Sequence, residues 1–134
     1  MQIGYQTRII IELLMSAFLA ILFLQSGLDK VLDWAGNKSY IASVFEKTPL
    51  KRFSTFLLFC VTCTEILAGL LCAAGLLAIL LSRDRTLAFM GACLSSVNIV
   101  NLFLGQRIAK DYAGAAGLVP YFLTTIVAVA MLSP

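Results

Sequence analysis

Four apolar stretches occupy most of this chain, at residues 9–28, 53–81, 87–104 and 113–132. A helix needs ~20 apolar residues to cross the ~30 Å hydrocarbon core of a bilayer, and each stretch is close to that length or longer. Helices also satisfy their own backbone polar groups, which lipid cannot do. The sequence therefore predicts an all-α membrane protein, a four-helix transmembrane bundle that forms a single domain over residues 1–134.

Composition supports this class and excludes several functions. The chain is 60% hydrophobic and 13% charged, whereas soluble domains have about 45–50% apolar and about 25% charged residues. Because there is no histidine, His-ligated haem, His-containing zinc sites and Ser-His or Cys-His catalysis are excluded. The basic residues flank the apolar stretches, where membrane topology explains them. We expect no metal, no nucleic acid partner and no self-contained hydrolase or kinase activity.

The first apolar stretch is expected to stay in the protein. It is longer than the hydrophobic region of a signal peptide, and no Ala-x-Ala-like site follows it. Residues 29–52 then form the longest segment outside the spans. Its apolar residues recur at roughly helical spacing, which predicts a short interfacial amphipathic helix that Thr48-Pro49 terminates. Aromatic side chains of this segment are the candidate partner interface: Trp34, Tyr40 and Phe45.

Four spans place both termini on one side of the membrane and loops 1 and 3 on the other. Loops 1 and 3 carry most of the basic side chains, namely Lys30, Lys38, Lys47, Lys51, Arg52, Arg107 and Lys110. The opposite side carries Arg8, Arg83 and Arg85. The positive-inside bias then predicts that loops 1 and 3 are cytoplasmic and that the protein is integral to the cytoplasmic (inner) membrane.

Two carboxylates lie inside apolar stretches, where ionisable groups are costly and usually functional or paired. Glu65 follows Phe53 by 12 residues, or ~18 Å of helical rise, which predicts a position near the membrane midplane. It is the candidate for proton exchange or for anchoring a ligand headgroup. In the alternative it is structural and is satisfied by neighbouring hydroxyls: Thr62, Thr64, Ser95 and Ser96. Glu12 is expected to pair with Arg8 at i,i+4 spacing close to the interface.

Further polar side chains gather toward the end of the bundle formed by loops 1 and 3. A polar end above apolar walls suits an amphiphile such as a quinone, with its ring hydrogen-bonded and its tail in lipid. The candidate ligand-binding residues are Gln25, Lys30, Glu65, Asn98, Asn101 and Asp111. In the alternative, these side chains only satisfy helix ends and contact lipid headgroups.

All four cysteines, at positions 60, 63, 72 and 93, lie within apolar stretches. Cys60-x-x-Cys63 could act as a redox dithiol beside a quinone. However, apolar surroundings leave a thiol unreactive, and no cysteine pair lies in a loop to relay electrons. We therefore expect small buried hydrophobic side chains and keep thiol–disulfide chemistry as a weaker alternative.

Three segments together resemble the DoxX/DoxD family of small four-helix membrane proteins. The first is Phe-Leu-Gln-Ser-Gly-Leu-Asp-Lys-Val at 23–31, which is similar to the family's hydrophobic-Ser-Gly-x-x-Lys end of helix 1. The second is Glu65-x-x-x-Gly69 followed by Gly75, and the third is Lys110-Asp111 followed by Gly114.

This resemblance implies a membrane subunit with Lys30, Glu65 and Asp111 at its site. Some family members resemble or form part of thiosulfate:quinone oxidoreductases, and others are implicated as anchors in assemblies that handle thiol stress. The wider superfamily includes a methylamine-utilisation maturation protein with proposed thiol–disulfide work. Since one scaffold hosts many sites, the family alone does not fix the reaction. A complete oxidoreductase would need another subunit, because this chain has no soluble redox domain.

Our first hypothesis is a subunit of a larger membrane complex, without a cofactor of its own, that binds a quinone or lipid and supports a redox partner. It would be at most a non-catalytic or quinone-binding subunit of an oxidoreductase. Glu65 would share the proton, Lys30 would counter developing negative charge, and the amides would hold the headgroup. The second hypothesis is a purely structural or assembly subunit. A membrane thiol–disulfide protein using Cys60 and Cys63 and a transporter that must oligomerise are the weaker alternatives.

Overall fold

The protein is described by a computed structural model that covers residues 3–134. Its elements in chain order are α1 (Tyr5–Leu32), α2 (Trp34–Val44), η1 (Lys51–Phe53), α3 (Ser54–Ser82), α4 (Thr86–Ile108), α5 (Tyr112–Gly117) and α6 (Val119–Leu132). Four helical segments are long and apolar enough to span a membrane: α1, η1 with α3, α4, and α5 with α6. The predicted all-α four-helix membrane bundle is therefore confirmed.

Helix α1 extends beyond the predicted span 9–28 at both ends, because its charged residues continue the helix outside the apolar core. Lys30 therefore belongs to the last turn of α1 and not to a loop. The last span is divided at Leu118, between α5 and α6. Pro120 lies in the first turn of α6, where its missing N–H costs no hydrogen bond.

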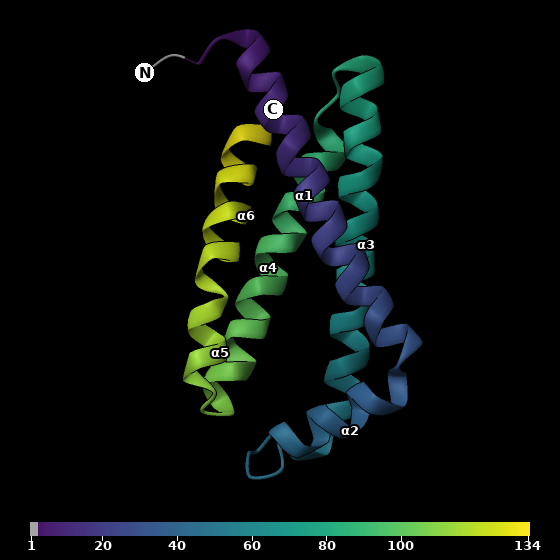
Figure 1. The fold of residues 1–134 in the computed structure, drawn as a ribbon, viewed down its shortest axis with the longest axis vertical. Helices are drawn as coiled ribbons and strands as arrows, with labels where there is room; N and C mark the ends of the chain where they lie inside the picture. The colour runs from purple at the N-terminus through teal and green to yellow at the C-terminus, as the bar shows by residue number, and fades with distance from the viewer. Residues whose placement is uncertain (1–2) are drawn as a thin grey trace.

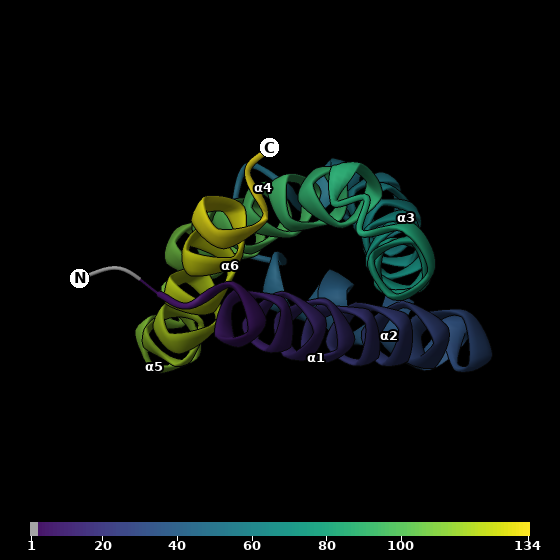
Figure 2. The same ribbon diagram turned by 90° about the horizontal axis from the view of Figure 1, so that it is seen from above.

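The helices form an arc closed by α1. Helix α3 packs against α1 and α4, and α6 packs against α4 and α1. Seen from above, α6, α4 and α3 curve around one side and α1 crosses the other (Figure 2). The start of α1 and the end of α6 lie at one end of the bundle, and α2 lies across the other (Figure 1). The buried core consists mainly of Leu19, Phe23, Ala68, Cys72, Ile79, Ala88, Ala92, Ile99, Ala128 and Leu132.

Small residues fix the register between α3 and α4. A Cβ on Gly91 would lie 2.6 Å from Cys72 Sγ, and a Cβ on Gly75 would meet the backbone of Ala88. These contacts pair residue 75 with 88 and residue 72 with 91 in an antiparallel arrangement. Since both helices rise equally per residue, the same register places Glu65 level with Asn98.

The predicted short helix between the first two spans is confirmed as α2. Its half-buried residues, Trp34, Asn37, Ile41 and Val44, share one face, and α2 packs against α3. Tyr40 is 61% exposed, whereas Phe45 is 8% exposed and its ring tip lies 3.5 Å from where a Cβ on Gly105 would be. Among the three candidate interface residues, Phe45 is thus covered within the chain.

Candidate functional site

Ser26, Lys30 and Glu65 form one closed polar cluster between α1 and α3. Lys30 Nζ lies 2.9 Å from Glu65 Oε2, and Ser26 Oγ donates to the same oxygen at 3.1 Å. Lys30 Nζ also donates to Ser26 Oγ at 2.9 Å. The side chain of Glu65 is 1% exposed and that of Lys30 is 19% exposed, so the cluster is an ion pair held inside the bundle.

Two glycines bring α1 and α3 close enough for these contacts. A Cβ on Gly27 would lie 2.6 Å from Ile66 Cγ1, and a Cβ on Gly69 would lie 2.6 Å from Leu24 Cγ and 2.8 Å from its backbone nitrogen. Small residues at such positions let helix backbones approach. Ser26 and Lys30 are four residues apart, so they share a face of α1. The spacing Ser-Gly-x-x-Lys on α1 and Glu-x-x-x-Gly on α3 thus builds one site from two helices.

The cluster leaves one oxygen of Glu65 available. Within residues 3–134, all hydrogen bonds and ion pairs to this carboxylate go to Oε2, and Oε1 has no partner. Oε1 is not one of the fully buried atoms without a partner, so this oxygen keeps some accessible surface and can accept from a donor that reaches it. A ligand hydroxyl or N–H group is the kind of partner this oxygen can take.

Asn98 adds an unused donor at the level of Glu65. Its side chain is 2% exposed, and its amide Nδ2 has no hydrogen-bond partner in the described part of the chain. Buried polar groups are normally paired, so an unpartnered amide at this depth marks a position that a ligand or water could complete.

The other predicted ligand-binding residues lie elsewhere. Gln25 and Asn101 are exposed, and no hydrogen bond among residues 3–134 joins either of them to the cluster. Asp111 is exposed and caps α5, where its Oδ1 accepts from the backbone N–H of Gly114 at 3.0 Å. The structure therefore brings Lys30 and Glu65 together, places Asn98 level with them, and does not gather Gln25, Asn101 and Asp111 there.

The hydroxyls expected to satisfy Glu65 do not do so, and that alternative is wrong in its details. Thr62, Thr64, Ser95 and Ser96 each donate to a carbonyl of their own helix. This is the local competition that Ser and Thr side chains commonly make in helices. Ser26 is the hydroxyl that reaches Glu65. The signal that could have found it was its i,i+4 spacing from Lys30.

Glu65 lies near the middle of the candidate span Lys51–Ser82, and its depth in the membrane stays a prediction. Its partners Ser26 and Lys30 lie in the last two turns of α1. Glu65 thus lies at the level where α1 ends.

A protein-family model matches the part of the chain that contains most residues of this site. The model of the DoxX family matches residues 11–102, more than half of the chain. The chain belongs to the DoxX family. The matched region contains Ser26, Lys30, Glu65 and Asn98, and it ends before Asp111 and the last span. No curated protein and no solved structure matches the chain.

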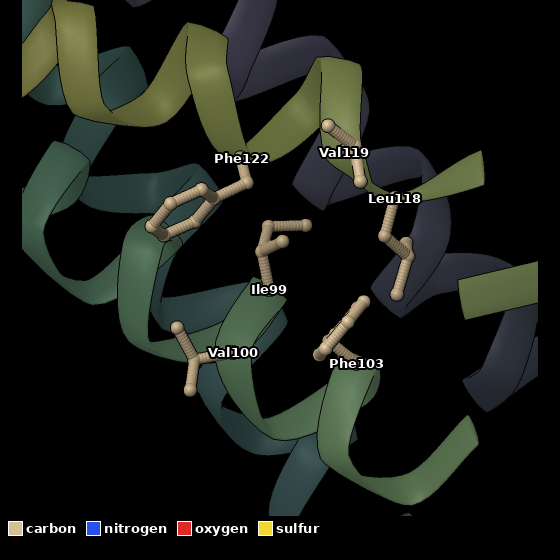
Figure 3. A pocket seen from close by; sticks show the side chains of 6 residues that line it. All are labelled: Ile99, Val100, Phe103, Leu118, Val119 and Phe122. Atoms are coloured by element: carbon tan, nitrogen blue, oxygen red, sulfur yellow. The ribbon is translucent and has the colours of Figure 1, made fainter. Parts of the chain in front are cut away.

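This DoxX chain also has an apolar pocket beside α4. The pocket has a volume of about 320 Å³ and lies between α4 and the last span (Figure 3), lined by Ile99, Val100, Phe103, Leu118, Val119 and Phe122. Its first lining residue directly follows Asn98 in the chain. The sequence does not predict this pocket, because the pocket depends on how α5 and α6 pack against α4.

The second buried carboxylate of the DoxX chain is at the opposite end of the bundle. Arg8 Nε lies 2.9 Å from Glu12 Oε1, which confirms the expected i,i+4 pair. Arg85 Nη1 contacts the same oxygen at 3.1 Å, a partner 73 residues away that spacing could not identify. Arg8 Nη2 also donates to Met131 O at 3.0 Å. This cluster ties the starts of α1 and α4 to the end of α6.

The cysteines of the DoxX chain are all free thiols. Cys72 is buried, Cys60 and Cys93 are half-buried, and Cys63 is exposed on the bundle surface. Among the described residues, no three His, Cys, Asp or Glu side chains are grouped to hold a metal. The expected burial is confirmed for Cys72 and wrong for Cys63, and thiol–disulfide chemistry at Cys60 and Cys63 stays the weaker alternative.

Proposed function

We propose that this DoxX-family protein is a membrane subunit that binds the polar head of a quinone-class amphiphile beside Glu65 and supports a redox partner. The observation that carries the proposal is the pairing of a free acceptor with a free donor. Glu65 Oε1 and Asn98 Nδ2 are both without partners within residues 3–134, and the α3–α4 register puts the two residues at one level. The reduced, quinol head of such an amphiphile presents the complementary groups, because a hydroxyl both donates and accepts.

The chemistry of each residue follows from its charge and its contacts. In the reduced, quinol form, one hydroxyl would donate to Glu65 Oε1 and the oxygen of a hydroxyl would accept from Asn98 Nδ2. Lys30 would stabilise negative charge that develops on the reduced oxygen, because a cation a few ångströms away acts strongly in a water-poor site. Ser26 keeps Lys30 and Glu65 in place. The isoprenoid tail would follow the apolar pocket that begins at Ile99.

The electrons would come from a partner. The chain contains no histidine, and in this proposal a flavin, haem or iron–sulfur protein supplies them. In this proposal the protein lies in the cytoplasmic membrane with loops 1 and 3 on the cytoplasmic side, and the exposed side chain of Tyr40 on α2 is available to that partner.

The test is to purify the tagged protein from native membranes in mild detergent and to measure the quinone and the proteins that stay bound. We expect near-stoichiometric quinone with wild type and a loss of about tenfold for Glu65→Gln, since a site built around a hydrogen bond discriminates strongly when that bond is lost. Glu12→Gln is the matched control, because Glu12 is equally buried and ion-paired. Equal quinone in wild type and Glu65→Gln would contradict the proposal.

A second candidate is an assembly subunit without a redox role. One observation favours it: Lys30, Ser26 and Glu65 satisfy one another inside the bundle, as a purely structural ion pair would. In that case Tyr40→Ala should release the co-purifying partner and Glu65→Gln should not. Recovery of a stoichiometric partner without redox chemistry would favour this candidate, and a partner carrying flavin, haem or iron–sulfur would favour the first.

A further inference from the structure

The end of the bundle where α1 starts and α6 ends (Figure 1) holds a small basic cavity. Its volume is about 170 Å³, and its lining residues are Tyr5, Arg8, Ile9, Glu12, Ile79, Arg83 and Arg85. Three guanidinium groups thus face this space together with one carboxylate. The remaining lining side chains are apolar or aromatic.

Glu12 orients two of the three arginines. Its oxygen Oε1 accepts from Arg8 Nε at 2.9 Å and from Arg85 Nη1 at 3.1 Å. Glu12 is 3% exposed, whereas the side chains of Arg8 and Arg85 are 40% and 30% exposed. The buried carboxylate therefore holds two partly exposed guanidinium groups side by side and neutralises only one of their charges.

Many donors of these arginines remain unused. A guanidinium group carries five N–H donors. Among the described residues, Arg85 bonds only through Nη1, and Arg8 uses Nε and Nη2. Arg83 makes no hydrogen bond through its side chain and lies over the Tyr5 ring at 6.0 Å from its centroid. The cavity thus combines an excess of positive charge with free N–H groups.

Asp84 is the other charged residue of the turn between α3 and α4. Its Oδ1 accepts from the backbone N–H of Thr86 at 2.9 Å, and it does not line the cavity. The local charge therefore stays positive at the cavity itself.

We propose that this cavity binds a phosphate-class anion. Guanidinium groups recognise phosphate oxygens through paired, charge-assisted hydrogen bonds. Ile9 and Ile79 in the same wall suit a group in which phosphate adjoins hydrocarbon. An anionic phospholipid headgroup and free phosphate share this chemistry, and the experiment separates them. The site is independent of Glu65 and of the proposed quinone.

The test uses native mass spectrometry of the full chain in mild detergent. The protein is titrated with phosphatidylglycerol and, separately, with phosphatidylcholine, and the apparent Kd of the first bound lipid is measured. Inorganic phosphate is then added as a competitor. Arg83→Gln is the diagnostic variant, because Arg83 is exposed and its loss breaks no hydrogen bond. Arg107→Gln is the matched control: Arg107 lies over a tyrosine ring in the same way, at 4.5 Å from the Tyr112 centroid, at the other end of α4.

We expect phosphatidylglycerol to bind wild type more tightly than phosphatidylcholine, and Arg83→Gln to weaken it about fivefold, the effect of one basic residue at an anionic lipid surface. Arg107→Gln should leave the apparent Kd unchanged. If millimolar phosphate displaces the lipid from wild type, the site recognises the phosphate itself and also takes the free anion. If phosphate does not compete, the ligand is the lipid headgroup. Equal binding of both lipids, or equal weakening by both substitutions, would overturn the proposal.

Discussion

Lys30 Nζ and Glu65 Oε2 lie 2.9 Å apart, at the place where Gly27 and Gly69 let α1 and α3 touch. One residue comes from the last turn of the first helix and the other from the second membrane span. Each belongs to one of two short motifs, Ser-Gly-x-x-Lys and Glu-x-x-x-Gly, among the three segments by which the sequence resembles its family. The motifs are therefore two halves of one site.

Replacing one partner of this ion pair should lower the free energy of unfolding more than replacing both partners together. Lys30→Met would leave the buried Glu65 carboxylate without its counter-charge, so we expect the free energy of unfolding to fall by about 3 kcal/mol. The double variant Lys30→Met/Glu65→Leu removes both charges and should recover most of that loss. Unfolding in detergent, followed by circular dichroism, measures both. Additive losses in the double variant would show that the pair is not coupled.

Gly69 is expected to be intolerant of even one methyl group. Its Cβ would lie 2.8 Å from the backbone nitrogen of Leu24, so Gly69→Ala must push α1 away from α3. We expect a loss of about 1–3 kcal/mol, the usual cost of overpacking. Gly117→Ala is the control, because nothing lies within 4 Å of its Cβ position. Equal melting temperatures for the two variants would contradict the close approach.

Arg85 should matter for stability although it lies far from Glu12 in the chain. Arg85→Gln removes one of the two hydrogen bonds that the buried carboxylate accepts. We expect a loss of about 2 kcal/mol, typical of a hydrogen bond to a charged group. Arg52→Gln changes an exposed arginine and should have little effect. A melting temperature of Arg85→Gln equal to that of Arg52→Gln would mean that Arg8 alone holds Glu12.

Asp84 gives a pH-dependent contribution outside the membrane. Hydrogen bonds from Thr86, chiefly from its backbone N–H, lower the pKa of Asp84 below its usual value of 3.8. A lowered pKa means that the folded state prefers the carboxylate. The added stability is then fully present above pH 3.8 and is lost as pH falls through the lowered pKa. Wild type should therefore melt above Asp84→Ala at pH 7, and the difference should shrink at the lowest pH the fold tolerates. A constant difference across this range would contradict the assignment.

Much of the fold could be predicted from the sequence, because each span needs about 20 apolar residues and such runs are visible without any knowledge of packing. Lys30 and Glu65 could also be identified, since charged residues in or beside apolar runs are unusual. Their contact could not be derived, because it depends on the α1–α3 register that Gly27 and Gly69 set in three dimensions.

The other differences between the predicted and the observed contacts also arise from packing between helices that are distant in the sequence. Arg85 joins Glu12 only because α4 begins beside α1, which no local spacing indicates. Asn98 and Asn101 are both candidate ligand-binding residues by sequence, but only Asn98 is buried. Packing against neighbouring helices decides which residues of a helix face are covered.

The most direct test of the proposed quinone site is photo-crosslinking. The purified protein is illuminated with a short-chain azidoquinone, and the labelled residues are mapped by mass spectrometry in wild type, Glu65→Gln and the control Glu12→Gln. We expect labelling around Glu65 and Asn98 that is strongly reduced in Glu65→Gln and unchanged in Glu12→Gln. Labelling that is spread over the exposed helix faces, or that is equally strong in Glu65→Gln, would contradict it.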